Sequence, residues 1–292
     1  MKIQIVSDLH LEYRSKKIYD ILVPSAPILC MVGDICVCGN KEDFDKFINF
    51  LDYFHTKFEA IVHVAGNHEY YTGEHASPEE LAENTMTNID KKLKKLGRQY
   101  NNYFYLNNST WEYTNAKANK SYVFVGTTLW SYIPPQIEIQ DEKTKKMKKI
   151  NLHDAVEQMM NDYNYIYVSV RDQRIKLPYR QFRVLDMQKK HRAAVAFVKR
   201  IIAGAKRTEK IYILLTHHKP IFDRATDKSD EYTYAYESDL ADVLLVHPFI
   251  AAAHGHTHIH YDKKINGVRV VSNPKGYIGQ NTDYNDKFTI IV

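Results

Sequence analysis

Cysteine is scarce in this sequence, and the three cysteines that occur stand close together. Cys30, Cys36 and Cys38 are an odd number in one short stretch of the 292-residue chain. They do not make a disulfide framework, so they indicate a reducing, cytoplasmic compartment. The C-x-C spacing of Cys36 and Cys38 is also unlike a zinc-ribbon pattern. We therefore expect buried thiols at these positions.

Long apolar runs are missing as well. No window of about 18 uncharged apolar residues occurs, so the sequence predicts no membrane-spanning helix and no membrane partner. The first residues, "MKIQIV", lead directly into a short apolar run without the pattern of a signal peptide. This again favours a cytoplasmic location.

A large excess of charge is the third absence. The formal net charge is +5, and 26% of the residues are charged. Such a balance is compatible with an anionic substrate but does not by itself indicate nucleic-acid binding. The tyrosine content is high by contrast, with 22 residues.

Short apolar runs alternate with helical patterns along most of the chain. The runs span 3–6, 26–32, 60–65, 121–126, 211–215, 249–253, 268–271 and 288–292, and the helical patterns span 41–58, 77–96, 185–205 and 238–246. Alternation of this kind predicts an α/β fold with helices packed on a sheet. Because the last third is rich in strands and has a hairpin signal at Asn266–Gly267, we expect a four-layer α/β/β/α sandwich of two packed mixed sheets flanked by helices.

The stretch from about 133 to 184 does not follow this rhythm. It contains a Pro-Pro pair, a lysine run over 143–149 and a tyrosine-rich segment. No linker flanks it, so we expect a single domain over 1–292 with an insertion at 133–184. The lysine run is typical of a solvated loop.

Polar side chains follow five of the apolar runs, at the point where each run ends. They are Asp8, His10, Asp34, Asn67, His68, His217, His256 and His258. Because the carboxyl ends of the strands share one edge of a sheet, we expect these side chains to converge. Buried carboxylates are costly unless they are paired or bound to metal. Such a set of oxygen and imidazole ligands suits two divalent ions, with Mn²⁺ favoured and Fe, Zn²⁺ or Ni²⁺ as alternatives.

The five polar blocks resemble those of the calcineurin-like metallophosphoesterase superfamily. The pattern of that superfamily, DxH, GD, GNH[ED], H and GHxH, stands here as "DLH" (8–10), "GD" (33–34), "GNHE" (66–69), "THH" (216–218) and "GHTH" (255–258). The stretches 126–130 and 265–277 also look like those of small phosphohydrolases in the superfamily.

This resemblance implies a role for each residue. Asp8, His10 and His258 would bind the first metal, Asp34 would bridge the pair, and Asn67, His217 and His256 would bind the second. His218 adjoins His217 and is the alternative to it. His68 would protonate the leaving oxygen or stabilise charge in the transition state, oriented by Asp8, while water activated by the metals attacks phosphorus; His68 and Asn67 would also contact the substrate. Many relatives carry a further acidic residue shortly after "GD", which this sequence lacks.

The predicted function is that of a dimetal phosphoesterase. A protonating histidine helps most when the leaving group is a poor alkoxide, so we expect phosphodiesters, with a small phosphorylated substrate such as a nucleotide. The alternatives are a phosphomonoesterase or protein phosphatase, a nuclease, and a scaffold without activity. The "GDxVDRG" and "LRGNHE" forms typical of protein phosphatases are absent. Since every ligand position is retained, the scaffold is the least favoured, and the oligomeric state stays open.

Overall fold

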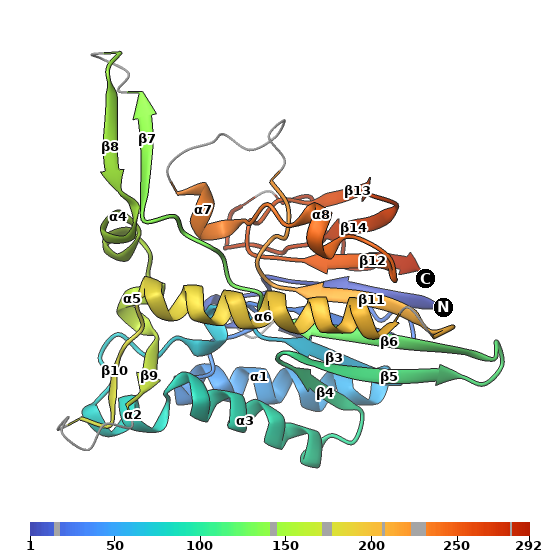
Figure 1. The fold of residues 1–292 in the computed structure, drawn as a ribbon. Helices are drawn as coiled ribbons and strands as arrows, with labels where there is room; N and C mark the ends of the chain where they lie inside the picture. The colour runs from blue at the N-terminus through green and yellow to red at the C-terminus, as the bar shows by residue number, and fades with distance from the viewer. Residues whose placement is uncertain (15–17, 141–144, 171–176, 206–207, 223–231, 281) are drawn as a thin grey trace.

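Two mixed β-sheets form the centre of the molecule (Figure 1). The computed structural model describes residues 1–14, 18–140, 145–170, 177–205, 208–222, 232–280 and 282–292. The first sheet has the order β15 (Thr289–Ile291), β1 (Lys2–Val6), β2 (Ile28–Val32), β3 (Ala60–Val64) and β4 (Tyr103–Leu106). Strands β1 to β4 run parallel, and only β15 is antiparallel to its neighbour.

The second sheet combines a parallel centre with antiparallel edges. Its order is β13 (Tyr261–Ile265), β14 (Val268–Ser272), β12 (Phe249–His254), β11 (Ile211–Thr216), β6 (Lys120–Thr127) and β5 (Ser109–Asn115). The hairpin between β13 and β14 turns at Asn266 and Gly267, whose φ angles are 49° and 87°. Left-handed conformations at both turn residues are what an Asn-Gly hairpin turn requires, so this prediction is confirmed.

The two sheets pack face to face through a purely apolar layer. From the first sheet it includes Ile5 and Val62, and from the second Phe124, Leu215 and Ala253, all essentially buried. This arrangement explains why the central strands, such as β2 and β3, read as continuous apolar runs, because they are buried on both faces.

Helices cover the outer face of each sheet, which completes four layers (Figure 1). Helices α1 (Lys41–Phe54) and α3 (Met86–Gln99) pack on the first sheet, and α6 (Val184–Ala205) and α8 (Ala241–Leu244) pack on the second. The predicted α/β/β/α sandwich is therefore confirmed.

Three of the four predicted helices differ from the structure in their extent. The helix expected over 41–58 ends at Phe54 and is followed by the 3₁₀ helix η3 (His55–Lys57). The expected helix over 77–96 is two helices, α2 (Pro78–Glu83) and α3, because Asn84 and Thr85 interrupt it. The Asn84 side chain donates a hydrogen bond to the Glu80 carbonyl, and Thr85 is extended at the start of α3. Both residue types favour caps over helix interiors. The helix expected over 238–246 is only the four residues of α8.

Short helices fill several of the connections. They are the 3₁₀ helices η1 (Leu11–Tyr13), η2 (Ile18–Asp20), η3 (His55–Lys57) and η4 (His68–Tyr70), together with the one-turn helix α7 (Thr233–Tyr236). Of the described helices, none has the length and apolar content needed to cross a bilayer.

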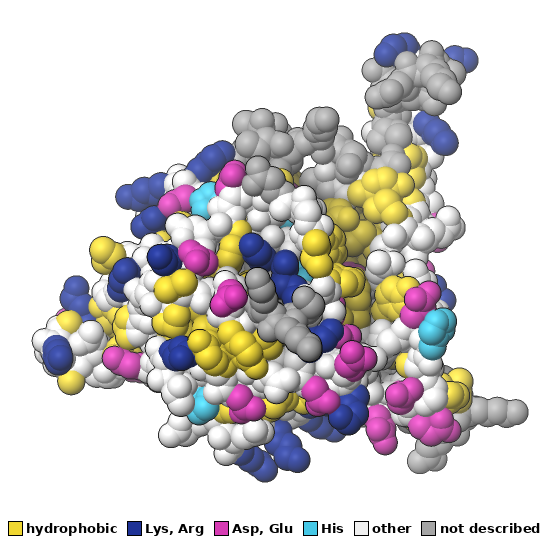
Figure 2. All heavy atoms as spheres, turned by 180° about the vertical axis from the view of Figure 1, so that it is seen from behind, with side chains coloured by type: hydrophobic (Ala, Val, Ile, Leu, Met, Phe, Trp, Pro, Cys, Tyr) yellow, Lys and Arg dark blue, Asp and Glu magenta, His cyan; other side chains and the backbone are white. Residues whose placement is uncertain are grey.

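The segment 133–184 contains two hairpins and two helices. These are β7 (Gln136–Gln140) with β8 (Met147–Asn151), α4 (Leu152–Met159), α5 (Asp162–Tyr165), and β9 (Tyr167–Ser169) with β10 (Tyr179–Gln181). The β7–β8 hairpin projects from the sandwich as an arm (Figure 1), with Lys or Arg side chains near its end (Figure 2). Lys148 and Lys149 in β8 are exposed, whereas 143–144 lie outside the described residues. The single domain over 1–292 stays a prediction.

Candidate metal centre

The structure brings together all eight of the polar residues that the sequence places at strand ends. Strand β1 leads to Asp8 and His10, β2 to Asp34, β3 to Asn67 and His68, β11 to His217, and β12 to His256 and His258. All are buried except His258, which is partly exposed. The carboxyl edges of both sheets therefore contribute to one site.

Five of these residues have a left-handed backbone. The φ angles are 52° for Asp8, 46° for His10, 53° for Asp34, 71° for His256 and 53° for His258. For residues other than glycine this conformation is uncommon, and each instance costs on the order of 1–3 kcal/mol. A cluster of such residues marks a site where the surrounding structure holds strained backbone so that the side chains converge.

The first group of donor atoms comes from Asp8, His10 and His258, and these atoms all lie within 4.8 Å of one another. The Nε2 atoms of His10 and His258 are 3.1 Å apart, and His258 Nε2 lies 3.4 Å from Asp8 Oδ1. Among the described residues, Asp8 Oδ2 has no hydrogen-bond partner although it is buried. An unsatisfied carboxylate oxygen beside two imidazole nitrogens fits a divalent cation.

A second group of donor atoms comes from Asp34, His217 and His256. His217 Nε2 lies 3.3 Å from Asp34 Oδ1 and 3.1 Å from Asn67 Oδ1. Within the described part of the chain, the buried Nε2 of His256 has no hydrogen-bond partner. This group therefore fits a second cation, with the Asn67 amide oxygen as a further ligand.

Asp34 lies between the two groups. Its Oδ1 faces His217, while its Oδ2 is 4.0 Å from His10 Nε2. One carboxylate thus reaches both positions, as a bridging ligand would. The donor sets fit two cations, and the role of each ligand stays a prediction.

Two glycines make this close approach possible. A Cβ atom at Gly66 would stand 2.2 Å from Asp34 Oδ1, and one at Gly33 would stand 2.2 Å from His217 Nδ1. Gly33 also has a φ of +90°, which L side chains rarely adopt. The glycines of "GD" and "GNHE" are therefore required by the packing of the ligands themselves.

Of the two adjacent histidines, His217 is the one whose ring nitrogen lies among the donor atoms of the second group. His217 Nδ1 is 2.9 Å from the Val32 carbonyl, which directs Nε2 towards Asp34. His218 instead has Nδ1 3.3 Å from the Thr128 carbonyl, and its ring centroid lies 5.2 Å from that of Trp130. His218 therefore packs beside the donor atoms, against Thr128 and Trp130, and not among them.

Charge in the site is divided between carboxylates and imidazoles. Burial opposes ionisation of Asp34, but the attraction of His217, His68 and His10 holds its pKa well below the ordinary value. Burial would lower the pKa of His217, yet Asp34 and Asp8 raise it to about 10. Burial and the neighbouring His218 and His217 keep the pKa of His256 well below its ordinary value. A neutral, buried imidazole is the form that binds metal.

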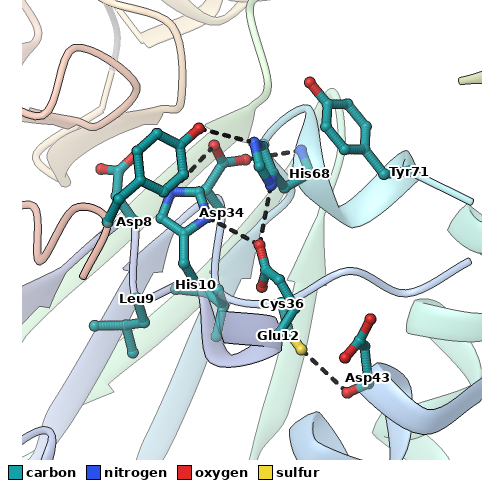
Figure 3. Close-up of polar contacts among 12 residues, drawn as sticks. Asp8, Leu9, His10, Glu12, Asp34, Cys36, Asp43, His68 and Tyr71 are labelled. Atoms are coloured by element: carbon teal, nitrogen blue, oxygen red, sulfur yellow. Dashed lines mark hydrogen bonds and ion pairs between the residues drawn. The ribbon is translucent and has the colours of Figure 1, made fainter. Parts of the chain in front are cut away.

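His68 is held on three sides (Figure 3). Its Nδ1 lies 3.0 Å from Glu12 Oε1, its Nε2 lies 3.3 Å from the Tyr277 hydroxyl, and its ring stacks on Tyr71. The sequence assigned the orienting role to Asp8. In the structure Glu12 occupies that place, because η1 turns its side chain towards His68, while Asp8 Oδ1 accepts the backbone N–H of His256.

The sequence did not point to Asp162, the buried first residue of α5 in the insertion. Its Oδ1 accepts hydrogen bonds from Asn67 Nδ2 at 2.8 Å and from the Tyr71 hydroxyl at 2.6 Å. These bonds settle which end of the Asn67 amide faces His217, since the amide nitrogen is engaged by Asp162. No local signal marks this aspartate, because the contact depends on how the insertion folds back.

Glu12, Glu69 and Tyr277 are the other contributors that were missed. Buried Glu69 accepts backbone N–H bonds from Asp34, Ile35 and Gly66 and so joins the loops after β2 and β3. Two signals in the sequence could have found the glutamates: Glu69 is the last residue of "GNHE", and Glu12 follows His10 by two positions. Tyr277 lies in the stretch 265–277, which the sequence comparison had related to small phosphohydrolases without assigning a role to the tyrosine.

A cavity of about 470 Å³ opens over the centre. Besides residues of the metal centre, it is lined by Tyr71, Tyr236, Tyr277, Met159, Met160 and Asn161. Among the described lining residues there is no lysine or arginine. Positive charge for an anionic substrate would thus come mainly from bound cations, while the walls combine aromatic and apolar side chains with the polar Asn161, Thr257 and Gln280.

An α/β/β/α sandwich with this paired donor set is the architecture of a metal-dependent hydrolase. The chain matches the family model of calcineurin-like phosphoesterases over residues 1–260, and it belongs to that family. It is therefore a metal-dependent phosphoester hydrolase by family.

The individual proteins and structures that this chain resembles have low sequence identity to it. An uncharacterised protein of Acanthamoeba polyphaga mimivirus is 26% identical over 305 residues, which cover 97% of this chain and 94% of the relative. The crystal structure of a phosphopantetheinyl hydrolase from Mycobacterium tuberculosis superposes with a TM-score of 0.64 at 16% identity, covering 94% and 89% of the two chains. A dimetal phosphatase from Danio rerio has a TM-score of 0.46 at 14% identity, covering 97% and 90%. The likeness to the hydrolase of M. tuberculosis supports the fold.

Proposed function

We propose that this protein hydrolyses phosphodiesters with two divalent cations, Mn²⁺ in the first instance. The observation that carries the proposal is the placement of His68. Its Nδ1 faces Glu12, whereas its Nε2 faces Tyr277 at the wall of the cavity. A ring held in this way can keep a proton at Nε2 and pass it to a leaving oxygen.

The other residues would hold the cations and the substrate. Asp8, His10 and His258 would hold the first cation, Asn67, His217 and His256 would hold the second, and Asp34 would contribute to both. Two cations at these positions would supply electrostatic stabilisation of the phosphoryl oxygens and a water of lowered pKa. Asn67 and His68, next to each other on the loop after β3, would contact the bound phosphoryl group.

The cavity walls support a diester with an uncharged organic group. Tyr71, Tyr236 and Tyr277 offer aromatic surface, and Met159 and Met160 offer adaptable apolar surface. A nucleoside is one group that such walls would accept. The similarity in fold to a phosphopantetheinyl hydrolase adds phosphopantetheinyl conjugates to the compounds worth testing.

The alternatives keep lower rank. A nuclease would need a broad basic surface, and acidic and basic side chains are interspersed over the face seen in Figure 2. A phosphomonoesterase acts on a dianion, for which the described cavity wall offers no lysine or arginine. The cytoplasmic location and a small phosphorylated partner stay predictions.

The test is hydrolysis of bis-p-nitrophenyl phosphate beside p-nitrophenyl phosphate. Protein stripped of metal is reconstituted with Mn²⁺, Fe²⁺, Zn²⁺ or Ni²⁺, and Asp34→Asn serves as the control for metal-dependent turnover. We expect a higher kcat/KM for the diester with Mn²⁺. A faster monoester reaction would replace the proposal with a phosphomonoesterase, and bound cations without any turnover would favour the scaffold.

A further inference from the structure

Glu12 is a buried carboxylate at the middle of η1, and its side chain is only 5% exposed. Its Oε1 atom lies 2.9 Å from Nδ1 of His10 and 3.0 Å from Nδ1 of His68 (Figure 3). The two imidazole rings meet edge to face, with centroids 4.5 Å apart and an interplanar angle of 76°. A single oxygen atom therefore contacts both rings.

These contacts determine which ring nitrogen carries a hydrogen. An ionised carboxylate only accepts, so Nδ1 of both His10 and His68 must donate to Oε1. The Nε2 atom of His10 is then left facing Asp34 and His258, and the Nε2 atom of His68 is left facing Tyr277. One ring presents its nitrogen to the metal centre and the other presents it to the cavity.

The surroundings of Glu12 suit this role. Its backbone carbonyl accepts a hydrogen bond from Lys46 Nζ at 2.8 Å, and Lys46 is itself paired with Asp43 at 2.9 Å. The loop 35–40, which follows Asp34, reads "ICVCGN" and contains no acidic residue. Within the described part of the chain, Glu12 is the carboxylate that reaches Nδ1 of His68.

We propose that Glu12 is a positioning residue shared by the two halves of the reaction machinery. Through one oxygen atom it holds His10 in the tautomer that binds the first cation and His68 in the orientation that serves the leaving oxygen. The His68 half of this inference rests on the proposed function, whereas the His10 half does not. A purely structural role, bracing η1 against α1, would affect neither ring specifically.

The decisive variant is Glu12→Gln, which preserves size. A glutamine oxygen at the same place can still accept from both Nδ1 atoms, but the amide is uncharged, so both hydrogen bonds are weaker than those to a carboxylate. Glu12→Asp keeps the carboxylate on a shorter stem and is expected to restore part of each effect. Glu209→Gln, at an exposed position after α6, is the matched control.

The first measurement compares phosphodiesters with good and poor leaving groups at saturating Mn²⁺. We expect Glu12→Gln to lose about 100-fold in kcat with an alkyl leaving group, the lower end for removing acid catalysis, and far less with p-nitrophenolate, which needs no proton. An equal loss with both substrates would contradict the His68 half, because a structural defect does not distinguish leaving groups.

The second measurement needs no turnover. Calorimetric titration of metal-free protein with Mn²⁺ should show the first site weakened about 10- to 100-fold in Glu12→Gln, as for other groups that orient a metal-bound histidine. Long-range ¹⁵N spectra should show a smaller share of the Nδ1–H form of His10 and His68 in Glu12→Gln than in the native protein, with His68→Ala identifying one set of signals. Unchanged affinity and unchanged tautomers would overturn the proposal. If the native protein hydrolyses no phosphodiester, the proposed function fails while this measurement still judges Glu12.

Discussion

The two sheets supply different chemistry to the same centre. The first sheet contributes both carboxylates, Asp8 and Asp34, the Asn67 amide, and the imidazoles of His10 and His68. The second sheet contributes imidazoles alone, those of His217, His256 and His258. Among these eight residues, both carboxylates therefore lie on one side of the junction between the sheets.

This division makes the centre a joint between the sheets as well as a reaction site. His217 lies 3.3 Å from Asp34, His258 lies 3.4 Å from Asp8, and the backbone N–H of His256 donates to Asp8 at 2.9 Å. Each of these contacts crosses from one sheet to the other. Substituting a carboxylate of the first sheet should therefore change the net charge of the metal centre. Substituting a histidine of the second sheet should remove a ligand without removing a negative charge.

The largest effect is expected for Asp34→Asn. The variant removes the carboxylate that reaches both cation positions, so phosphodiester turnover with Mn²⁺ should fall by about 10³-fold or more, comparable with the loss of a principal electrostatic group. The measurement is kcat/KM together with metal content by mass spectrometry. Activity within tenfold of the native enzyme would contradict a bridging role for Asp34.

Next in size is a paired test within the second sheet. His258→Ala should weaken the first cation site and His217→Ala the second, each by more than about 100-fold, the upper end for groups that only support a ligand. Titration of metal-free protein with Mn²⁺ distinguishes the two, because each variant should keep one tight site. His218→Ala is the control and should keep both; if it loses one while His217→Ala does not, the assignment must be exchanged.

Metal removal should lower the free energy of unfolding, because the bound cations connect ligands from both sheets. At a free Mn²⁺ concentration of 100 Kd, each site contributes about 2.7 kcal/mol to the free energy of unfolding. A chelator should therefore lower Tm by several degrees. In Asp34→Asn, which carries one negative charge less, the shift should be smaller. An equal decrease in Tm in the native protein and in Asp34→Asn would argue against a metal centre that connects the two sheets through Asp34.

A smaller effect is expected from the insertion. Asp162→Asn weakens the hold on the Asn67 amide, so affinity at the second cation site should fall about 10-fold, within the range for groups behind a ligand. The first site should be unaffected. Asp154→Asn, an exposed acid of the same insertion, is the control. Equal weakening of both sites would mean that Asp162 acts on overall stability and not through Asn67.

Local patterns predicted most of the framework. The apolar runs at 26–32 and 60–65 are strands because they are buried on both faces, and burial leaves a continuous apolar signature. Strand β5 was not predicted, since "STWEYTN" alternates in exposure and belongs to the sheet only through its antiparallel pairing with β6. The break in 77–96 depends on Asn84, whose side chain caps the helix instead of continuing it.

The candidate ligands were visible for a related reason. Each follows a strand directly, and strands of a parallel sheet end at a common edge, so Asp8, Asp34 and Asn67 could be expected to meet. Glu12 and Asp162 carry no such mark. Glu12 acts through its contact with His68, and Asp162 acts through its contact with Asn67, so both contacts join residues that are distant in the chain.

By itself, the sequence determined the four layers, the buried central strands and the polar residues at their ends, because strand burial and strand-end position are local properties of the chain. Tertiary structure alone decided which atoms face one another. It placed one oxygen of Glu12 between two histidines, turned the Asn67 amide by means of Asp162, and set the imidazoles of one sheet against the carboxylates of the other. Such contacts join segments far apart in the chain, and only the packing of the two sheets and the insertion brings them within hydrogen-bond distance.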